Sequence, residues 1–102
     1  MTPPPVDGAE VRIHVPTPLR ERCGGAGELR LPHAAAPTVR AALSELARRW
    51  PELHRGVCDE TGAVRRHVNL FVNQAHVRDR DGLDTLLAAG DVVMILPAVS
   101  GG

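Results

Sequence analysis

Residues 38–50 form the one long segment of this chain with the apolar spacing of a helix. Val39, Leu43, Leu46 and Trp50 recur at intervals of three or four residues, which places them on one helical face. The segments before and after it carry apolar side chains at every second position, which is typical of half-buried strands. A single apolar helix among strands buries its stripe most readily against the sheet. The pattern therefore predicts a two-layer α+β domain.

The first two strands are predicted to form a hairpin. The segment EVRIHVP, residues 10–16, alternates apolar and polar side chains, and ELRLP, residues 28–32, does the same. The connection between them, residues 17–27, contains prolines and paired glycines, which break regular structure and predict a long loop rich in turns.

The ends of the long helix are also marked. Thr38 is a suitable N-cap, because its hydroxyl can accept a hydrogen bond from an N–H group that the first turn leaves unpaired. Glu45 and Arg49 have the order and spacing of a favourable ion pair. Pro51 is expected to stop or kink the helix, and the segment PELHR then predicts one further turn before a loop.

The second half of the chain predicts two more strands with a short helix between them. The segment HVNLFVNQAHV, residues 67–77, alternates and then turns at Asn73. Residues 81–91, DGLDTLLAAGD, predict a helix of one or two turns with Gly90 as its left-handed cap. The segment VVMILP, residues 92–97, is apolar on both faces. It is therefore expected in the middle of the sheet or at a surface for a partner.

Alternation along this last strand separates two sets of side chains. Val93 and Ile95 are expected in the core beneath the helix. Met94 and Leu96 point the other way and, with Phe71 of the preceding strand, predict an apolar patch of the kind that binds partners. The alternative is that the long loop of the hairpin covers some of these side chains.

The charge pattern argues against a nucleic-acid partner. The 12 basic residues balance 12 acidic ones, and segments such as LRER and VRDRDG interleave the two signs. Cys23 and Cys58 lack zinc-ligand spacing, and no HxH or HExxH motif occurs. We therefore expect no metal site and scattered surface histidines, with either two ordinary thiols or a disulfide. Cys58 falls in an expected loop, which leaves its thiol open to exposure.

The chain is expected to be one cytoplasmic domain with a short segment at each end. Residues 1–9 are proline-rich and predict a disordered lead, without the basic and apolar regions of a signal peptide. The longest nearly continuous apolar run, residues 92–99, is too short to span a bilayer, so no membrane contact is expected. Residues 10–97 then form the domain, and residues 98–102 form a C-terminal tail.

The order of elements and the C-terminal segments resemble the ubiquitin-like sulfur carriers, the family of the molybdopterin synthase small subunit and the thiamine sulfur carrier. The motifs are VNQAHV at 72–77, GDVVMILP at 90–97 and AVSGG at 98–102. More loosely, VRIHVPTPLR and ETGAVRRHVNLFVN look most like carriers that supply a cysteine synthase. The resemblance covers residues 10–102. It implies a β-grasp fold, with a mixed sheet of four or five strands, one main helix on one face and a flexible Gly-Gly tail.

The resemblance also implies that Gly102 is the reactive residue. In such carriers an E1-like enzyme uses ATP to adenylate the C-terminal carboxylate, and a sulfur donor then converts it to a thiocarboxylate. The protein is a co-substrate, not an enzyme, and binds no cofactor itself. Gly101, which has no Cβ, lets the backbone thread into a narrow site. The tail beyond Pro97 reaches on the order of 20 Å at ~3.3–3.6 Å per residue.

Several partners follow from the same resemblance. Docking on the E1-like adenylating and sulfurtransferase enzyme is assigned to Phe71, Met94, Leu96, Pro97 and Val99. The preferred acceptor is a cysteine synthase that uses pyridoxal phosphate (PLP), with a metalloprotease that later processes the C-terminus. A thiosugar synthase is another acceptor that fits.

Three other functions stay open at this point. The chain fits the small subunit of molybdopterin synthase, whose tail inserts permanently into a larger subunit. It also fits a protein modifier joined through Gly102 to a lysine of a target, although the absence of lysine precludes lysine-linked self-chains. The third is a β-grasp binding module with a passive tail. An alanine added after Gly102 separates that case, because only a passive tail tolerates it.

Overall fold

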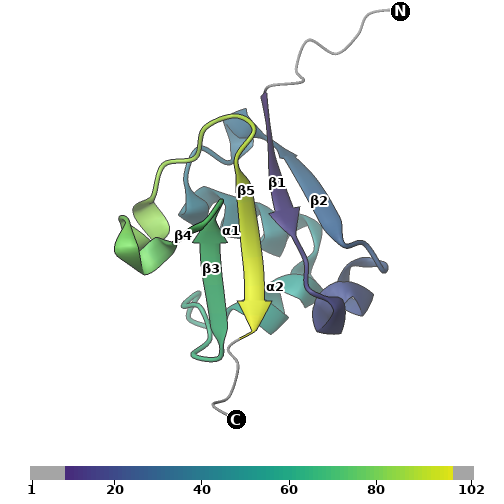
Figure 1. Cartoon of the computed structure of the whole chain (residues 1–102). Coiled ribbons are helices and arrows are strands. Elements are labelled where there is room, and N and C mark those ends of the chain that lie inside the picture. Colours follow the sequence, from purple (N-terminus) through teal and green to yellow (C-terminus); the bar gives the residue numbers. More distant parts are fainter. Residues whose placement is uncertain (1–8, 98–102) are drawn as a thin grey trace, which may run out of the picture.

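The computed structural model describes residues 9–97, which form a mixed five-stranded sheet with its α-helices on one side (Figure 1). The strand order is β2-β1-β5-β3-β4. β1 and β5 run parallel, and the other neighbouring strands are antiparallel. This is the predicted β-grasp arrangement, with β5 in the central position that its apolar character indicates. The strands are β1 (Glu10–His14), β2 (Glu28–Pro32), β3 (Val68–Val72), β4 (Ala75–His76) and β5 (Val92–Pro97).

The helical layer consists of α1 (Val39–Arg49) and α2 (Pro51–Val57). α1 begins where the sequence predicts, because the Thr38 hydroxyl accepts a hydrogen bond from the Ala41 N–H at 3.1 Å. Pro51 ends α1 and opens α2, since proline lacks an N–H group but fits the first turn of a helix.

The predicted ion pair of α1 is present and has a third member. The guanidinium of Arg49 lies 2.8 Å from the Glu45 carboxylate, and that of Arg48 lies 2.7 Å from it. Hydrogen bonds from Arg48 and then Arg49 hold the pKa of Glu45 below its ordinary value. The cluster is exposed to solvent, so its contribution to folding is small.

The core lies between this layer and the sheet and is almost wholly aliphatic. Val93 and Ile95 of β5 are each 1% exposed, and Leu46 of α1 and Leu53 of α2 are fully buried. Burial of a side chain of this size stabilises the fold by about 1.5–3 kcal/mol. A slip of β5 by one residue would turn every core side chain outward, so burial fixes which face of β5 is left open.

The connection between β1 and β2 is more regular than the sequence predicts. It contains the 3-10 helix η2 (Thr17–Cys23), which packs against α2. Pro18 suits the first turn of such a helix. Gly24 ends it in a left-handed conformation, with its N–H bonded to the Arg20 carbonyl. Proline and glycine therefore bound a short helix here, where a loop was expected.

The predicted helix over residues 81–91 is wrong in extent. Only the 3-10 turn η5 (Gly82–Asp84) forms, and the chain then becomes extended. The reason is tertiary hydrogen bonding. The Thr85 carbonyl accepts from the Val39 N–H at 3.0 Å, and the Leu87 N–H donates to Pro37 at 2.9 Å. These bonds tie the segment to the start of α1 and replace helical ones.

The predicted disordered lead lies outside the described residues, except for Ala9, and so does the predicted tail at 98–102. Within residues 9–97, none of the helices has the length and apolar character needed to cross a membrane. Two further 3-10 turns are η3 (His33–Ala35) and η4 (Val77–Asp79).

Candidate functional site

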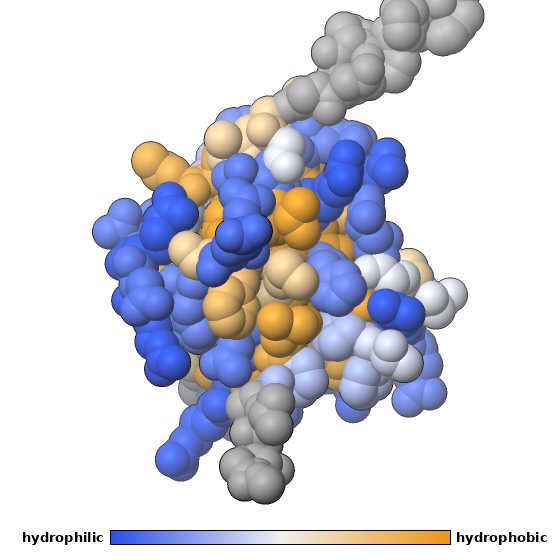
Figure 2. Space-filling model, in the orientation of Figure 1, coloured by the Kyte–Doolittle hydropathy of each residue, from blue (hydrophilic) through white to orange (hydrophobic). Residues whose placement is uncertain are grey.

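The sheet face turned away from the helices carries the predicted docking residues. Phe71, Met94 and Leu96 point to this face, opposite the core side chains of the same strands. Phe71 lies directly across from Met94 in the β3–β5 pairing. Each of the three is half-buried, as is Val92. We call these four residues the apolar strip. Figure 2 shows apolar side chains down the middle of this face, with hydrophilic ones on both sides.

The loop that was the alternative cover for the strip lies elsewhere. Residues 17–23 pack against α2, and Figure 1 shows them beyond the end of β1 and away from β3. The strip is therefore half-buried by contacts among its own side chains and with neighbouring side chains of the sheet. A flat, partly apolar sheet face of this kind is suited to binding a protein surface.

Two histidines extend the strip across the sheet. His14 of β1 pairs in register with Met94, and His76 of β4 pairs with Phe71. The His76 ring meets the Phe71 ring edge to face, with 5.0 Å between centroids. From the sequence, both histidines are predicted to be scattered surface residues. Only the strand register brings them together, and no motif in the sequence signals that register.

Hydrogen bonds hold the His76 ring in place. Its Nδ1 accepts from the Arg78 N–H at 3.1 Å, so we assign the proton of the neutral ring to Nε2. Nε2 then donates to the Asn69 side-chain oxygen at 3.1 Å. With both ring nitrogens bonded, His76 supports the Phe71 ring in one orientation.

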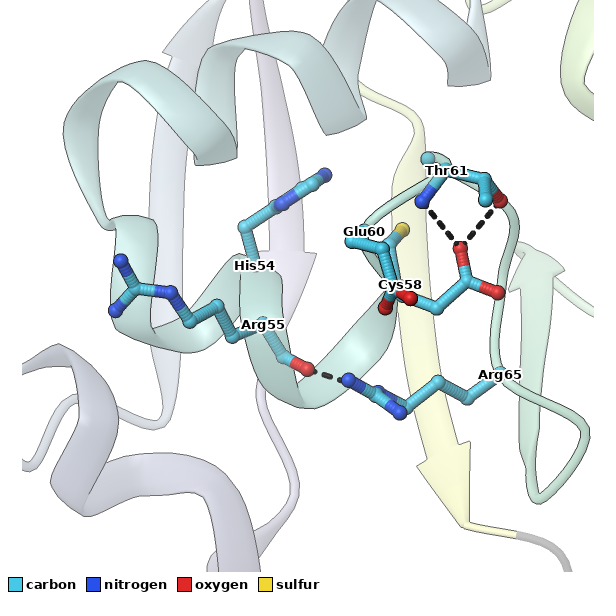
Figure 3. A pocket seen from close by; sticks show the side chains of 8 residues that line it. His54, Arg55, Cys58, Glu60, Thr61 and Arg65 are labelled. Carbon is cyan, nitrogen blue, oxygen red and sulfur yellow. Dashed lines mark hydrogen bonds between the residues drawn. The ribbon is translucent and has the colours of Figure 1, made fainter.

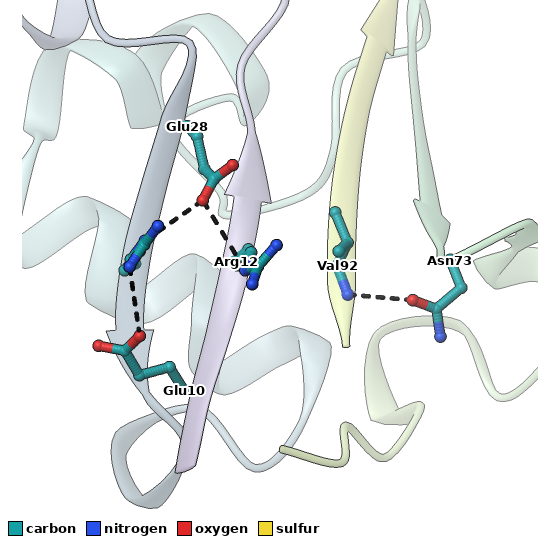
Figure 4. A network of polar contacts seen from close by, with 6 residues as sticks. Glu10, Arg12, Glu28, Asn73 and Val92 are labelled. Carbon is teal, nitrogen blue, oxygen red and sulfur yellow. Dashed lines mark hydrogen bonds and ion pairs between the residues drawn. The ribbon is translucent and has the colours of Figure 1, made fainter. Parts of the chain in front are cut away.

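The other half of the same face is charged. On β1 and β2, Glu28 lies between Arg12 and Arg30, and Arg30 also approaches Glu10 (Figure 4). The distances of 3.3–3.9 Å and the exposure of these groups make their net stabilisation small. Their effect is to give the apolar strip a polar border, as protein interfaces commonly have.

A turn and a Gly-Asp pair set the start of β5. Asn73 is left-handed, with φ of 57°, and its side-chain oxygen accepts from the Val92 N–H at 3.1 Å (Figure 4). Its amide group donates to the Asp91 carboxylate at 3.1 Å. Asp91 also accepts from the Ala88 N–H at 2.8 Å. Gly90, with φ of 92°, supplies a backbone turn that other residues rarely adopt, although it does not cap a helix as predicted.

The end of β5 is where the described structure stops. Pro97 is exposed and pairs in register with Val68. The predicted docking residue Val99 and the predicted reactive residues Gly101 and Gly102 lie outside the described residues. An apolar cavity of about 120 Å³ adjoins Pro97 and is bounded by Ile95 and by residues of η2 and α2.

A larger open pocket, of about 500 Å³, lies beside the loop after α2 (Figure 3). Cys58 lines it but is only 1% exposed, so the expectation of an exposed thiol is wrong. Burial, and then the Asp59 charge, raise the pKa of Cys58, so the thiol is not activated. Cys23 is buried too, and both cysteines are free.

Hydrogen bonds within this loop account for the polar side chains of the pocket. One Asp59 carboxylate oxygen accepts from the N–H and the hydroxyl of Thr61, at 2.8 and 2.5 Å, and from the Ala63 N–H at 3.2 Å (Figure 3). The hydrogen bonds from Thr61, before that from Ala63, lower the pKa of Asp59. The Asp59 carboxylate therefore stabilises the backbone of its own loop through these hydrogen bonds.

The described residues offer the apolar strip and the end of β5 as binding surfaces. Across residues 9–97, no three His, Cys, Asp or Glu side chains come together in a way that could hold a metal ion. The chemistry that the sequence predicts concerns the chain beyond Pro97. The described domain therefore contributes the apolar strip and the end of β5.

Comparison with known proteins identifies the family. The ThiS family profile matches residues 13–102. The sulfur carrier protein CysO of Mycobacterium tuberculosis is 37% identical over 94 residues, which cover 90% of this chain and 98% of that protein.

Solved structures agree with this match. A crystal structure of M. tuberculosis CysO superposes with a TM-score of 0.77 at 35% identity, covering 87% of this chain and 99% of that one. The small archaeal modifier protein 1 of Methanosarcina acetivorans gives 0.78 at 31% identity, over 92% and 97%. The Amycolatopsis orientalis BexX/CysO complex gives 0.78 at 30% identity, over 90% and 99%.

Proposed function

The chain belongs to the ThiS family of ubiquitin-like sulfur carriers, and from this premise we propose that it carries sulfur on the terminal carbonyl of Gly102. It acts as a protein co-substrate for partner enzymes. The family match, which extends through residue 102 at high coverage of a CysO sulfur carrier, is the observation that carries the proposal.

The proposed chemistry has two steps on the partner enzyme. The Gly102 carboxylate attacks the α-phosphorus of ATP, and pyrophosphate leaves. A hydrosulfide-equivalent donor then attacks the acyl-adenylate carbonyl, AMP leaves, and the product is the thiocarboxylate. Adenylation is needed because a carboxylate oxygen is a poor leaving group until it is bound to phosphate. Gly101 allows the close backbone approach that entry into the nucleotide site requires.

The described geometry supports docking by the sheet face. β5 carries Met94 and Leu96 on its open side and ends at Pro97, five residues before Gly102 in the sequence. An enzyme seated on the apolar strip therefore lies against the strand that leads into the reactive segment. Phe71, Met94, Leu96, Pro97 and Val99 are proposed as the contacts.

The direct test is intact mass after incubation with ATP, the E1-like adenylating enzyme and a sulfide donor. We expect a gain equal to the exchange of one oxygen for sulfur, assigned to Gly102 by fragmentation. A chain with one alanine added after Gly102 is the matched control and should show no gain. No gain in the unmodified chain with a competent enzyme contradicts the proposal.

The buried cysteines make a second readout possible. Because Cys23 and Cys58 are shielded in the folded chain, an alkylating reagent applied under native conditions should label the thiocarboxylate alone. The unactivated chain should take up no label. Peptide mapping shows which residue carries the label. Label on Cys23 or Cys58 in the native activated chain would contradict the expectation that only the thiocarboxylate reacts.

The proposed sulfur acceptor is a PLP-dependent cysteine synthase, with a metalloprotease that releases the product from the C-terminus. The CysO relatives are named sulfur carriers, which supports sulfur delivery to a partner enzyme. A relative named CysO is found in complex with BexX, which supports binding to a partner protein. A thiosugar synthase is a second acceptor that fits the family resemblance. Transfer of labelled sulfur from the loaded carrier to each enzyme's product distinguishes the two.

A second candidate function is protein modification, which the small archaeal modifier protein 1 favours at 31% identity. In that case Gly102 forms an amide with a lysine of a target protein. Cells that express a tagged chain would contain heavier tagged conjugates that resist reduction and require Gly102. Their absence, together with loaded thiocarboxylate in the same cells, would favour sulfur transfer alone.

A further inference from the structure

Beside the end of β5 lies a pocket of about 330 Å³ with three arginines in its lining. Its walls are Leu19 and Arg22 of η2, Arg55 and Gly56 of α2, and Arg65 and His67 of the segment before β3. We call these six residues the basic edge. Segments far apart in the sequence form it. The basic edge is therefore a product of the fold.

Two of the arginines are held by backbone carbonyls instead of carboxylates. The Arg65 Nε donates to the Arg55 carbonyl at 2.9 Å (Figure 3), and an Arg22 terminal nitrogen donates to the Glu52 carbonyl at 3.3 Å. These bonds orient the guanidinium groups and leave their positive charge in place. They also leave further N–H donors on each group, since a guanidinium has five.

The nearby acids neutralise this charge only in part. Glu52 forms an ion pair with Arg55. The Asp59 carboxylate, whose charge is felt by Arg65, is already bonded within its own loop. Among the described residues that line the pocket there is no carboxylate. A surface on a chain of zero net charge thus concentrates several positive groups at one place.

An apolar cavity adjoins the basic edge. It has a volume of about 120 Å³, shares Leu19, Gly56 and His67 with the basic edge, and extends to Pro97. The wall between the two is tightly packed, because a Cβ on Gly56 would lie 3.0 Å from a Leu19 methyl carbon. In protein interfaces, a side chain of the partner often fills an apolar pocket of this kind, and arginines beside the pocket add charged contacts.

We propose that the basic edge and this cavity together bind an acidic segment of the adenylating enzyme, with an apolar side chain in the cavity and carboxylates on Arg22 and Arg65. This inference rests on the proposed function and adds a docking surface separate from the apolar strip. Position supports the assignment, because an enzyme that receives the chain beyond Pro97 lies against this end of the molecule. Charge complementarity supports it too, since arginine binds carboxylates through two parallel hydrogen bonds.

The test is the double variant Arg22→Gln and Arg65→Gln, compared with Arg40→Gln. Arg40 is an exposed arginine on α1 that pairs with Asp84 and does not line the pocket. Two assays are run with the E1-like adenylating enzyme of the same organism. One measures ATP–pyrophosphate exchange, and the other measures binding to the chain shortened to residues 1–97, a form that cannot be adenylated.

We expect KM for the double variant to rise by about tenfold or more, with kcat unchanged, because the lost contacts serve association. Binding to the shortened chain should fall by a similar factor and lose much of its salt dependence. Arg40→Gln should behave like the unmodified chain. Arg65→Lys, which keeps the charge but not the paired donors, should recover only part of the loss. Circular dichroism and thermal unfolding check that each variant folds.

The outcomes separate the two proposals. If the double variant exchanges and binds like the unmodified chain, the docking role of the basic edge is contradicted and the proposed adenylation still holds. Arginine-dependent binding without any exchange supports the basic edge and contradicts the proposed function. A fall in kcat at constant KM overturns the docking role. Loss of binding to a short duplex DNA in the double variant, with binding to the enzyme unchanged, would assign the surface to a polyanion instead and overturn the inference.

Discussion

Asp59 shows how one side chain organises a loop. Its carboxylate accepts hydrogen bonds from the Thr61 N–H and hydroxyl and from the Ala63 N–H. These bonds favour the charged form, which is why the pKa of Asp59 is lowered in the folded chain. The loop beside α2 therefore depends on a negative charge that is exposed to solvent.

The lowered pKa predicts a pH dependence with a definite sign. The stabilisation by Asp59 is fully present above the ordinary pKa of 3.8 and is lost as the pH falls through the lower folded value. NMR titration should find the Asp59 carboxyl below 3.8, and the loop amides of residues 59–63 should exchange faster in acid. Asp59→Asn should remove this acid response. An unshifted Asp59 in the titration would contradict the assignment.

The two cysteines predict a protected thiol pattern. Both are buried, and burial raises the pKa of Cys58. We expect an alkylating reagent to leave the folded chain unlabelled and to label two sites in denaturant, measured by intact mass. Rapid labelling of Cys58 under native conditions would mean that the loop opens far more readily than its hydrogen bonds suggest.

At the scale of elements, alternate side chains of β5 pack in the core and line the open face of the sheet. Ile95 is 1% exposed and packs under the helices, whereas Met94 is half-buried on the open face. Ile95→Ala should therefore lower the free energy of unfolding by about 2–5 kcal/mol. Met94→Ala, one residue away, should cost about 1 kcal/mol or less. Urea unfolding of both variants measures this, and equal losses would contradict the assigned faces.

The turn before β4 is the second element with a specific requirement. Asn73 is left-handed and bonds through its side chain to Val92 and Asp91. Asn73→Ala should lower the free energy of unfolding by about 1–3 kcal/mol, because it loses these bonds and keeps the backbone strain. Asn73→Gly loses the same bonds without the strain and should be less harmful. If glycine proved worse than alanine, the strain would not be the cause.

At the scale of the whole molecule, the apolar strip lies on the open face of the sheet, and β5 ends at one end of the molecule. The helices cover the opposite sheet face (Figure 1). The sheet face therefore stays available, and the proposed partner contacts converge where the described chain ends.

This arrangement predicts separate effects on folding and on association. Leu96→Glu puts a charge in the apolar strip, and it should weaken binding to the adenylating enzyme by about tenfold or more while the chain stays folded. Ser44→Glu, an exposed position on α1, puts the same charge on the helical side and should leave binding unchanged. Surface plasmon resonance measures both. Equal weakening would show a general charge effect and not a docking face.

The sequence by itself determined the elements whose pattern is local. Period-two alternation located β1, β2 and β3, and a continuous apolar run located β5. The apolar stripe with Thr38 and Pro51 located α1 and the start of α2. The same alternation separated Ile95 from Met94, because successive side chains of a strand face opposite ways. The order of elements and the motifs VNQAHV, GDVVMILP and AVSGG were enough to predict the family that the comparison confirms.

Only the tertiary structure decided what depends on contacts between distant segments. Residues 85–87 are extended because they bond to the chain before α1, although their composition suits a helix. Cys58 is buried because the loop that holds it folds back on the core. Strand register placed His14 and His76 beside the apolar strip, and the packing of η2 on α2 gathered three arginines at the end of β5. None of these pairings leaves a periodic signal, since each joins positions that are far apart along the chain.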